Sequence, residues 1–240
     1  MSLFHSTLTT NAEPQAPDAA HAPRVAHVPG VAYPGLRARV TVMSEHDDVR
    51  QIPWSEGRWT HAPVSTREEG GQLLVEAAEE SDAWRHTAYG FVHDSEHALL
   101  APLPEGAAME VDFDLAYEEM FDQAGIFVRA SDEDWVKAGV EVSDGLPQLG
   151  AVVTHGKSDW SCGPVPQWAG RTVTVRASRY SDALVVRAKA EGEDWRLVRM
   201  APFAASGSVA AGPHVAAPSR AGLVVRFRAW RLTAGDAALH

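Results

Sequence analysis

The stretch DQAGIFVRASDEDWVKAGVEVSDG, Asp122–Gly145, predicts two β-strands, followed by a turn at its final Asp-Gly pair. Because side chains alternate between the faces of a strand, Trp135, Lys137, Gly139 and Glu141 share one face of the second strand. The residues between them are small and aliphatic, and we expect that face to be buried. The opposite face carries an aromatic ring, a cation and a carboxylate in a row, which indicates a binding site if the face is concave.

The same kind of pattern continues along the chain from Ile52, as short alternating runs separated by Gly, Pro, Asp and Ser. A single helical turn at Ala116–Phe121 is compatible with the pattern. Antiparallel strands at a spacing of about 8–12 residues are typical of a sandwich or barrel. The predicted strands are Leu73–Ala77, Trp84–Phe91, Ala107–Leu115, Gln123–Ala130, Trp135–Val142, Leu149–Thr154, Arg171–Ser178, Ala183–Lys189, Trp195–Met200 and Ala221–Trp230. Tight turns are predicted at Asp144-Gly145, Ser181-Asp182 and Glu191-Gly192.

The first part of the chain differs in composition from the rest. Asn11–Gly35 is crowded with Ala, Pro and His, and such a segment buries too little apolar surface to offset the entropy of ordering. We therefore predict a flexible leader over residues 1–50, one β-sandwich domain over 51–232 and a C-terminal tail over 233–240.

Composition and charge exclude several classes of protein. The chain has 32 acidic and 21 basic residues and a formal net charge of −11, which repels a phosphate backbone, so we expect no nucleic-acid partner. Cys162 is the only cysteine, so no disulfide forms within the chain, and a reducing cytoplasm is the expected compartment. Neither a membrane-spanning apolar run nor a signal-peptide pattern is present. The phosphate-binding glycine loops that mark nucleotide cofactors are also absent from the sequence, and we predict no cofactor.

Several predicted strands have one aliphatic face and one face of long polar or aromatic groups. If these faces converge on a concave sheet, they form a cleft with more cations than anions, suited to an anionic or polyhydroxylated ligand. The alternative is that they are solvated outer positions of antiparallel strands. The residues concerned are Arg85, Tyr89, Arg129, Lys137, Glu141, Arg176 and Arg199.

The segment Thr154–Pro166 is rich in turn-forming residues, and we interpret it as a loop. It contains Asp159 and Trp160. A tryptophan in so polar a loop either caps the edge of the core or forms a rim on which a ligand stacks.

Metal binding and catalysis have few signals in the sequence. His93, Asp94 and His97 lie in a predicted turn without a clear fourth ligand, so we predict no metal site, and His97 is expected to bond a backbone group or to line the cleft. For a glycosidase, which needs two carboxyl groups, the candidates are Glu141 with Asp159, or Glu110 at the start of an acidic stripe. A solvent-exposed acidic face is the favoured interpretation of that stripe.

At this level of detail the chain resembles a known family. The motifs are WRHTAYGFVHDSEHAL (Trp84–Leu99), DQAGIFVR (Asp122–Arg129), WVKAGVEVSDG (Trp135–Gly145), VVTHGKSDWS (Val152–Ser161), DALVV (Asp182–Val186) and GPHVAAP (Gly212–Pro218). Together they resemble the bacterial and fungal domain family related to the regulation-of-enolase protein, over about Ile52–Trp230. The resemblance implies an all-β, concanavalin A-like lectin/glucanase sandwich (jelly roll). It implies no particular reaction.

Carried over to this chain, the family motifs contain a set of polar and aromatic residues that either hold the fold together or form a site. They are Trp84, Thr87, Tyr89, His97, Asp122, Gln123, Arg129, Trp135, Lys137, Glu141, Ser158, Asp159 and Trp160. His86 and His93 are not features of the family motifs.

Three functions are compatible with these observations, and we favour the first. It is a non-catalytic domain that binds a carbohydrate or small polar metabolite on the concave sheet face. The second is a protein-interaction module that regulates a metabolic enzyme such as enolase, and the third is a glycoside hydrolase or related carbohydrate-active enzyme. The predicted ligand-binding residues are Arg85, Tyr89, His97, Arg129, Trp135, Lys137, Glu141, Asp159, Trp160 and Arg199.

Overall fold

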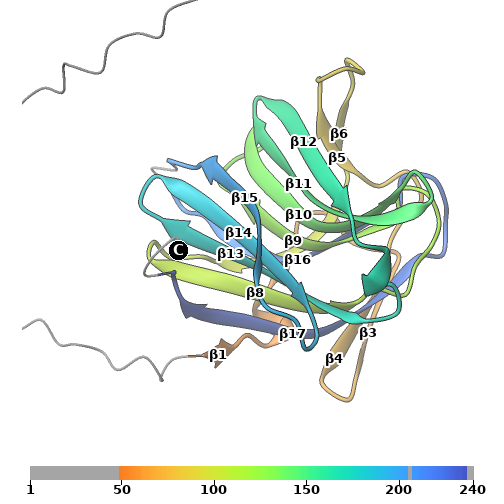
Figure 1. Ribbon diagram of the computed structural model, residues 1–240, viewed down its shortest axis with the longest axis horizontal. Helices are drawn as coiled ribbons and strands as arrows, with labels where there is room; N and C mark the ends of the chain where they lie inside the picture. Colours follow the sequence, from red (N-terminus) through yellow and green to blue (C-terminus); the bar gives the residue numbers. More distant parts are fainter. Residues whose placement is uncertain (1–48, 205–206, 237–240) are drawn as a thin grey trace, which may run out of the picture. The chain divides into compact units, whose positions relative to one another are not determined.

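The computed structural model describes residues 49–204 and 207–236 (Figure 1). The predicted leader therefore lies outside the described residues, apart from its last two positions. Within the described ranges, helical structure is confined to the single 3-10 turns η1 (Trp54–Glu56) and η2 (Pro166–Trp168). No helix in these ranges has the length and apolar character that crossing a membrane requires.

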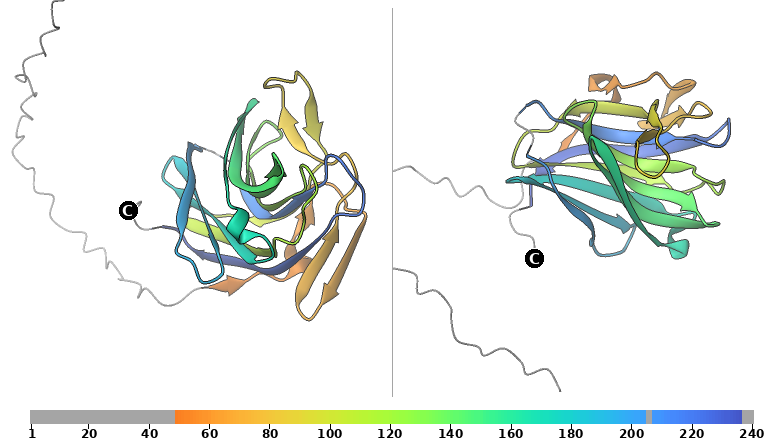
Figure 2. Two further views of the ribbon diagram at one scale, coloured as in Figure 1. Left: turned by 45° about the vertical axis from the view of Figure 1, so that its right-hand side comes forward. Right: turned by 90° about the horizontal axis from the view of Figure 1, so that it is seen from above.

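Nearly all regular structure in the described residues belongs to two large antiparallel sheets. The first sheet runs in the order β15 (Arg196–Pro202), β14 (Ala183–Ala190), β13 (Thr172–Tyr180), β8 (Ala107–Asp114), β17 (Val224–Ala234), β4 (Gln72–Glu76) and β3 (Ser65–Glu69), with β1 (Arg50–Gln51) also paired to β17. The second sheet runs in the order β12 (Lys157–Pro164), β11 (Leu146–His155), β10 (Asp134–Ser143), β9 (Gln123–Arg129), β16 (Ala210–Ala216), β7 (His97–Pro102) and β2 (Arg58–Trp59). A separate hairpin of β5 (Ala83–Arg85) and β6 (Val92–Asp94) stands beside the second sheet (Figure 2).

The two sheets pack face to face around one apolar core (Figures 1 and 2). Val136, Ala138 and Val140 of β10 point into this core, as their alternation predicts. The first sheet contributes large buried side chains, including Phe113 and Trp230. Burial of apolar surface on this scale is the main stabilising term of the fold. The predicted concanavalin A-like antiparallel sandwich is confirmed.

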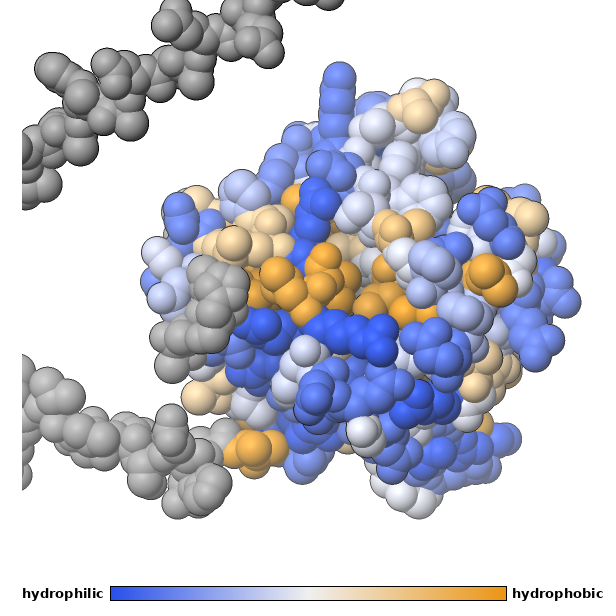
Figure 3. Space-filling model, in the orientation of Figure 1, coloured by the Kyte–Doolittle hydropathy of each residue, from blue (hydrophilic) through white to orange (hydrophobic). Residues whose placement is uncertain are grey.

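Apolar surface is also visible outside the core. In Figure 3 it forms a band across the middle of the face shown, while the lower part of that face is mainly hydrophilic. The edge strand β15 carries two exposed apolar side chains, Leu197 and Met200.

All predicted strands overlap an observed strand, but Trp84–Phe91 is wrong beyond Arg85, where β5 ends. The chain reverses after β5, and His86 and Ala88 have φ values of 62° and 63° that no strand accommodates. Alternation of residue type over this segment therefore reflects an aromatic hairpin tip and not a pleated strand.

The interpretation of Thr154–Pro166 as a loop is also wrong. Residues Lys157–Pro164 form β12, whose register with β11 pairs Val152 with Trp160. Because β12 is an edge strand with one partner, its polar composition is tolerated. The strands β1, β2, β3, β6, β7 and β16 were also not predicted, and Ala116–Phe121 forms no helix.

The predicted turns at Asp144-Gly145 and Ser181-Asp182 are confirmed as hairpin turns, and Glu191-Gly192 lies in the β14–β15 turn. Asp144 and Gly145 both have positive φ, at 54° and 73°. This is the geometry of a type I′ turn, for which Asp-Gly is favoured. The domain extends beyond the predicted end, because β17 continues to Ala234 and Asp236 forms an ion pair with Arg176.

Three glycines lie side by side across the second sheet. In the register of the strands, Gly139 of β10 is paired with Gly125 of β9 and with Gly150 of β11. A Cβ atom on Gly139 would lie 2.1 Å from the backbone oxygen of Ala124 and 2.7 Å from Cα of Gly125. Glycine is therefore required here for the close approach of neighbouring backbones.

Replacing Gly139 with Ala is expected to destabilise the domain by about 1–3 kcal/mol, since the added carbon overpacks the backbone of β9. Chemical denaturation of the two proteins measures the difference. Gly163→Ala is the matched control, because a Cβ at Gly163 of β12 meets no atom within 4 Å. Equal destabilisation by both substitutions would contradict a special packing requirement at Gly139.

Candidate functional site

A groove of about 950 Å³ lies between the outer face of the second sheet and the β5–β6 hairpin. The strands β9 to β12 supply its floor and the hairpin supplies one wall. Side chains far apart in the sequence meet here because β10 lies between β9 and β11 in the sheet, and the hairpin is bonded to β12 through Arg85 and Ser158. The lining residues are Glu80, Asp82, Trp84, Thr87, Ala88, Tyr89, Phe91, His93, Phe121, Gln123, Lys137, Glu141, Val152, Ser158, Asp159, Trp160 and Pro218.

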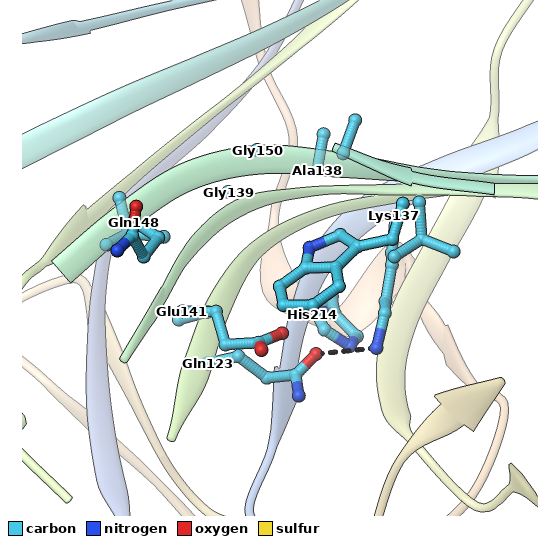
Figure 4. Close-up of a pocket in the computed structure, with 13 residues that line it drawn as sticks. Gln123, Lys137, Ala138, Gly139, Glu141, Gln148, Gly150 and His214 are labelled. Atoms are coloured by element: carbon cyan, nitrogen blue, oxygen red, sulfur yellow. Dashed lines mark hydrogen bonds between the residues drawn. The ribbon is translucent and has the colours of Figure 1, made fainter. Parts of the chain in front are cut away.

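Lys137 lies at the inner end of the groove and is only 6% exposed. Its Nζ donates to Asp82 Oδ1 at 2.6 Å. It also donates to Gln123 Oε1 at 2.8 Å (Figure 4). A buried ammonium requires such partners, because removal from water disfavours an unpaired charge. Gln123 also donates from Nε2 to Asp82 Oδ1 at 3.4 Å. The three side chains form one connected network that joins β9, β10 and the segment before the hairpin.

Glu141 points toward Gln123 and Lys137 across the same face (Figure 4). Burial raises the pKa of its carboxyl group to about 7, with Asp82 adding to the rise and Lys137 opposing it. In the described part of the chain, its carboxylate forms no hydrogen bond or ion pair. Near neutral pH, Glu141 is therefore present in both protonation states, so it is able to donate or accept a hydrogen bond to a ligand.

His214 of β16 lines a smaller pocket next to the groove, which shares Lys137 and Glu141 with it and includes Gly139 and Gly150. Burial lowers its pKa well below the ordinary range, so the imidazole is neutral. Its Nε2 is buried without a hydrogen-bond partner. The neutral ring packs 5.6 Å from Phe127.

Aromatic rings extend along the hairpin side of the groove. The ring of Tyr89 stacks on that of Phe91 at 5.3 Å and meets Trp84 edge-on at 5.9 Å. Tyr89 is 67% exposed, and on the other side of the groove Trp160 is 40% exposed. Exposed rings on both sides of a polar floor provide stacking surfaces for a ligand.

The hairpin is fixed to the second sheet by polar contacts of Arg85. The backbone N–H of Arg85 donates to Ser158 Oγ at 2.9 Å, and its guanidinium pairs with Glu133 at 2.5 Å. Arg85 therefore holds the hairpin in place and is not among the residues that line the groove.

The prediction of a cation-rich cleft is wrong. The carboxylates of Glu80, Asp82, Glu141 and Asp159 line the groove with one ammonium group, Lys137. The predicted arginines do not line the groove: Arg129 lies at the opposite end of β9 from Gln123, Arg176 lies on β13 of the first sheet, and Arg199 lies on β15.

Each of those arginines has an acidic partner. Arg129 pairs with Asp132 at 2.8 Å. Arg176 belongs to the first sheet and pairs with Glu110 at 2.8 Å. Arg199 pairs with Asp159 at 3.0 Å, beside the groove.

The predicted ligand-binding set divides into two groups. Tyr89, Lys137, Glu141, Asp159 and Trp160 line the groove. The others do not line it. These are Arg85, His97, Arg129, Trp135 and Arg199.

Two of the residues outside the groove have clear structural roles. His97 is buried, and its Nε2 accepts a hydrogen bond from the backbone N–H of Ala78 at 3.0 Å. Trp135 is buried and stacks on Phe127 with ring centroids 5.2 Å apart. Packing, and not ligand contact, explains both positions.

The two glycosidase candidate sets lie on different sheets. Glu141 and Asp159 both line the groove, whereas Glu110, Asp112 and Asp114 lie on β8 of the first sheet. Arginine side chains pair with the carboxylates of this acidic stripe. Arg231 donates hydrogen bonds to both Glu110 and Asp112. The stripe is a structural ion-pair network, so it differs from the solvated acidic face that we favoured.

Sequence reasoning did not assign Asp82, Phe121 or Pro218 to the site, although all three line the groove. They come from connections between strands, and no local pattern marks them. Gln123 could have been assigned from the sequence, because it is a family-motif residue. It lies on β9, paired with Glu141 of β10.

The raised pKa of Glu141 predicts that stability falls as pH rises from about 4.5 to about 7, since the unfolded carboxyl loses its proton before the folded one does. Glu141→Gln is expected to remove this part of the pH dependence. Chemical denaturation of both proteins between about pH 4 and pH 9 measures this pH dependence of stability.

Glu68→Gln, on the exposed strand β3, is the control and should keep the wild-type pH profile. Superimposable profiles for wild type and Glu141→Gln would show that Glu141 titrates normally.

With this geometry established, sequence comparison identifies the family. The profile of the family described as "Protein of unknown function (DUF1349)" matches residues 59–235. The chain belongs to this family. The matched range contains both walls and the floor of the groove, so the site is part of the family domain and not of the leader.

Relatives agree with this assignment. The chain is 40% identical over 180 residues to "Regulation of enolase protein 1" of Saccharomyces cerevisiae, covering 75% of this chain and 90% of that protein. A crystal structure of a functionally unknown protein from Saccharomyces cerevisiae superposes with a TM-score of 0.72 at 38% identity, over 77% of this chain and all of that one. The resemblance to the family related to the regulation-of-enolase protein is confirmed.

More distant structures share the fold alone. A GH43 protein from Bacillus licheniformis matches with a TM-score of 0.59 at 13% identity, over 80% of this chain and 40% of that one. A xylan β-1,4-xylosidase from Bacillus halodurans matches with a TM-score of 0.54 at 17% identity, over 69% and 33%. The DUF1349 domain is thus similar to a part of these glycosidases.

Proposed function

We propose that the domain is a non-catalytic binding module for a neutral carbohydrate, held in the groove between the second sheet and the β5–β6 hairpin. The observation that carries this proposal is the pairing of aromatic walls with a polar floor. Tyr89 and Trp160 offer ring faces to the apolar side of a sugar ring. Glu141 and Asp159 offer hydrogen-bonding groups to its hydroxyls.

The charge of the groove favours a neutral ligand over a phosphorylated one. Lys137 is already bonded to Asp82 and Gln123, so it has no unpaired charge to offer a phosphate. Asp159 is paired with Arg199, and the other two carboxylates of the groove, Glu80 and Glu141, repel anions. A neutral oligosaccharide or a small polyol avoids this repulsion and still uses the hydrogen-bonding groups.

The comparisons support a sugar ligand by analogy of fold. One of the structurally similar proteins is a xylan β-1,4-xylosidase, but one scaffold carries many functions. The support therefore comes mainly from the groove itself. We place the binding module in the cytoplasm, which the single, unpaired Cys162 favours.

Thermal shift and calorimetry of the full chain against neutral oligosaccharides, including xylo-oligosaccharides, and against sugar phosphates test the proposal. A neutral sugar is expected to raise the melting temperature, since it binds only the folded state. Trp160→Ala is expected to weaken binding about five- to tenfold, as loss of a stacking ring costs roughly 1–1.5 kcal/mol.

The matched control is Trp195→Ala. Trp195 has similar exposure, 37%, but packs against Lys189 of the first sheet. The control should bind as the wild type does. If only sugar phosphates bind, or if both tryptophan variants bind equally well, the proposed site is wrong.

A second function, regulation of a metabolic enzyme through direct contact, is favoured by one observation beyond the name of the yeast relative. The hairpin exposes Tyr89, Phe91 and Val92 together, which is an apolar surface suited to a protein partner. Mixing the purified chain with enolase and following the complex by size-exclusion chromatography tests this alternative. A complex that Tyr89→Ala disrupts would favour it over the sugar ligand, and no complex would count against it.

A further inference from the structure

Glu96, between β6 and β7, has a buried carboxylate that the surrounding protein does not satisfy. Its side chain is 1% exposed, and both Oε1 and Oε2 are buried without a hydrogen-bond partner. Buried carboxylates are normally paired, hydrogen-bonded or bound to a metal ion. Glu96 therefore calls for a partner that the described residues do not supply.

The neighbouring polar groups lie close to the Glu96 carboxylate but form no hydrogen bond with it. Arg129 Nη1 lies 3.9 Å from Oε1, and Arg129 already donates to Asp132 at 2.8 Å. The hydroxyl of Thr60 donates to the backbone oxygen of Glu96, at 3.0 Å, so its one proton is not available to the carboxylate. Arg129 is therefore shared between Glu96 and Asp132, and it forms no hydrogen bond with the Glu96 carboxylate.

His61 and Asp94 stand beside this carboxylate. His61 Nδ1 lies 4.0 Å from Glu96 Oε2 and 3.0 Å from the backbone oxygen of Glu96. One ligand atom from each of His61, Asp94 and Glu96 lies within 4.8 Å of the other two. Glu96 is buried at the base, whereas Asp94 is exposed and His61 is partly exposed, so an ion has access from solvent.

We propose that His61, Asp94 and Glu96 bind a divalent transition-metal ion such as Zn²⁺ or Mn²⁺. One imidazole and two carboxylates form a mixed nitrogen and oxygen donor set, which these ions accept and which differs from the all-oxygen sets typical of Ca²⁺ and Mg²⁺. The contact of the imidazole with the Glu96 backbone holds the ring beside the carboxylate, as hydrogen bonds to metal-binding histidines commonly do.

The proposed site replaces the set considered from sequence, His93, Asp94 and His97. His97 is not available, because Nε2 accepts from Ala78 and Nδ1 contacts the backbone oxygen of His61. His61 follows β2, more than thirty residues before Asp94, so the sequence spacing did not reveal it. The ion would connect the base of the hairpin, through Asp94 of β6, to the segment after β2.

The site is separate from the carbohydrate groove, since none of its three residues lines that groove. A result that refutes the metal site therefore leaves the carbohydrate-binding proposal untouched, and the reverse also holds. Metal binding is measured without any sugar.

The test uses the full chain after removal of metals with a chelator. Calorimetry and thermal shift are recorded with Zn²⁺ and Mn²⁺, and with Ca²⁺ and Mg²⁺ for comparison. The wild type is expected to bind one equivalent of Zn²⁺ or Mn²⁺ with a rise in melting temperature. Glu96→Gln and His61→Gln are each expected to weaken this binding by at least about tenfold.

His155→Gln is the matched control, because His155 is an exposed histidine that pairs with Asp134 away from the proposed site. It should bind as the wild type does. Loss of binding in the Glu96 and His61 variants, which keep His5, His21 and His27, separates the site from those histidines. If the purified Glu96→Gln protein is unfolded, His61→Gln at a partly exposed position decides the result.

Three results would overturn the proposal. The first is no response of the wild type to Zn²⁺ or Mn²⁺. The second is binding that the Glu96 and His61 variants retain in full. The third is a pair of findings: the wild type binds no metal, and metal-free Glu96→Gln melts at a higher temperature than the metal-free wild type. Together they would show that Glu96 is a buried neutral acid.

Discussion

The buried ammonium group of Lys137 is the interaction on which the groove depends. It lies on the central strand β10, and its two bonds reach Asp82, in the segment before the hairpin, and Gln123 on β9. An unpaired ammonium at this depth is strongly disfavoured, so the network holds the hairpin segment and the sheet in one arrangement. The floor and the aromatic wall of the groove meet because of this constraint.

The same network explains the chemistry of the groove. Lys137 is committed to Asp82 and Gln123, which leaves Glu141 without a direct partner in the described residues. Burial then raises the pKa of Glu141 to about 7. A groove with a committed cation and several carboxylates suits hydroxyl groups better than phosphates. The aromatic hairpin adds ring faces to this polar floor.

Ion pairs elsewhere stabilise the fold and do not create sites. The acidic stripe of β8 resembles a catalytic pattern in sequence, but each of its carboxylates pairs with an arginine of β13 or β17, the two strands beside β8. Arg228 bonds to Asp114, and Arg231 bonds to both Glu110 and Asp112. Such partners are invisible in a linear pattern, because β8 and β17 are more than a hundred residues apart.

Alternation along β10 was sufficient to predict which of its residues enter the core and which face outward, since side-chain direction in a strand is a local property. Turn chemistry likewise predicted the hairpin at Asp144-Gly145. Short strands with mixed composition, such as β12 and β16, were not predicted. Their strand conformation depends on pairing with β11 and β9, and that pairing is not encoded in their own periodicity.

The sequence by itself determined the fold class, the family and the outward face that carries Lys137 and Glu141. Only the tertiary structure decided which side chains share the groove, because that depends on strand order and on connections between strands. Arg129, Arg176 and Arg199 are similar in sequence terms, yet the fold directs them to three different acidic partners. Asp82 and Glu96 acquire their importance from burial next to residues distant in the chain, and burial is a property of the folded molecule.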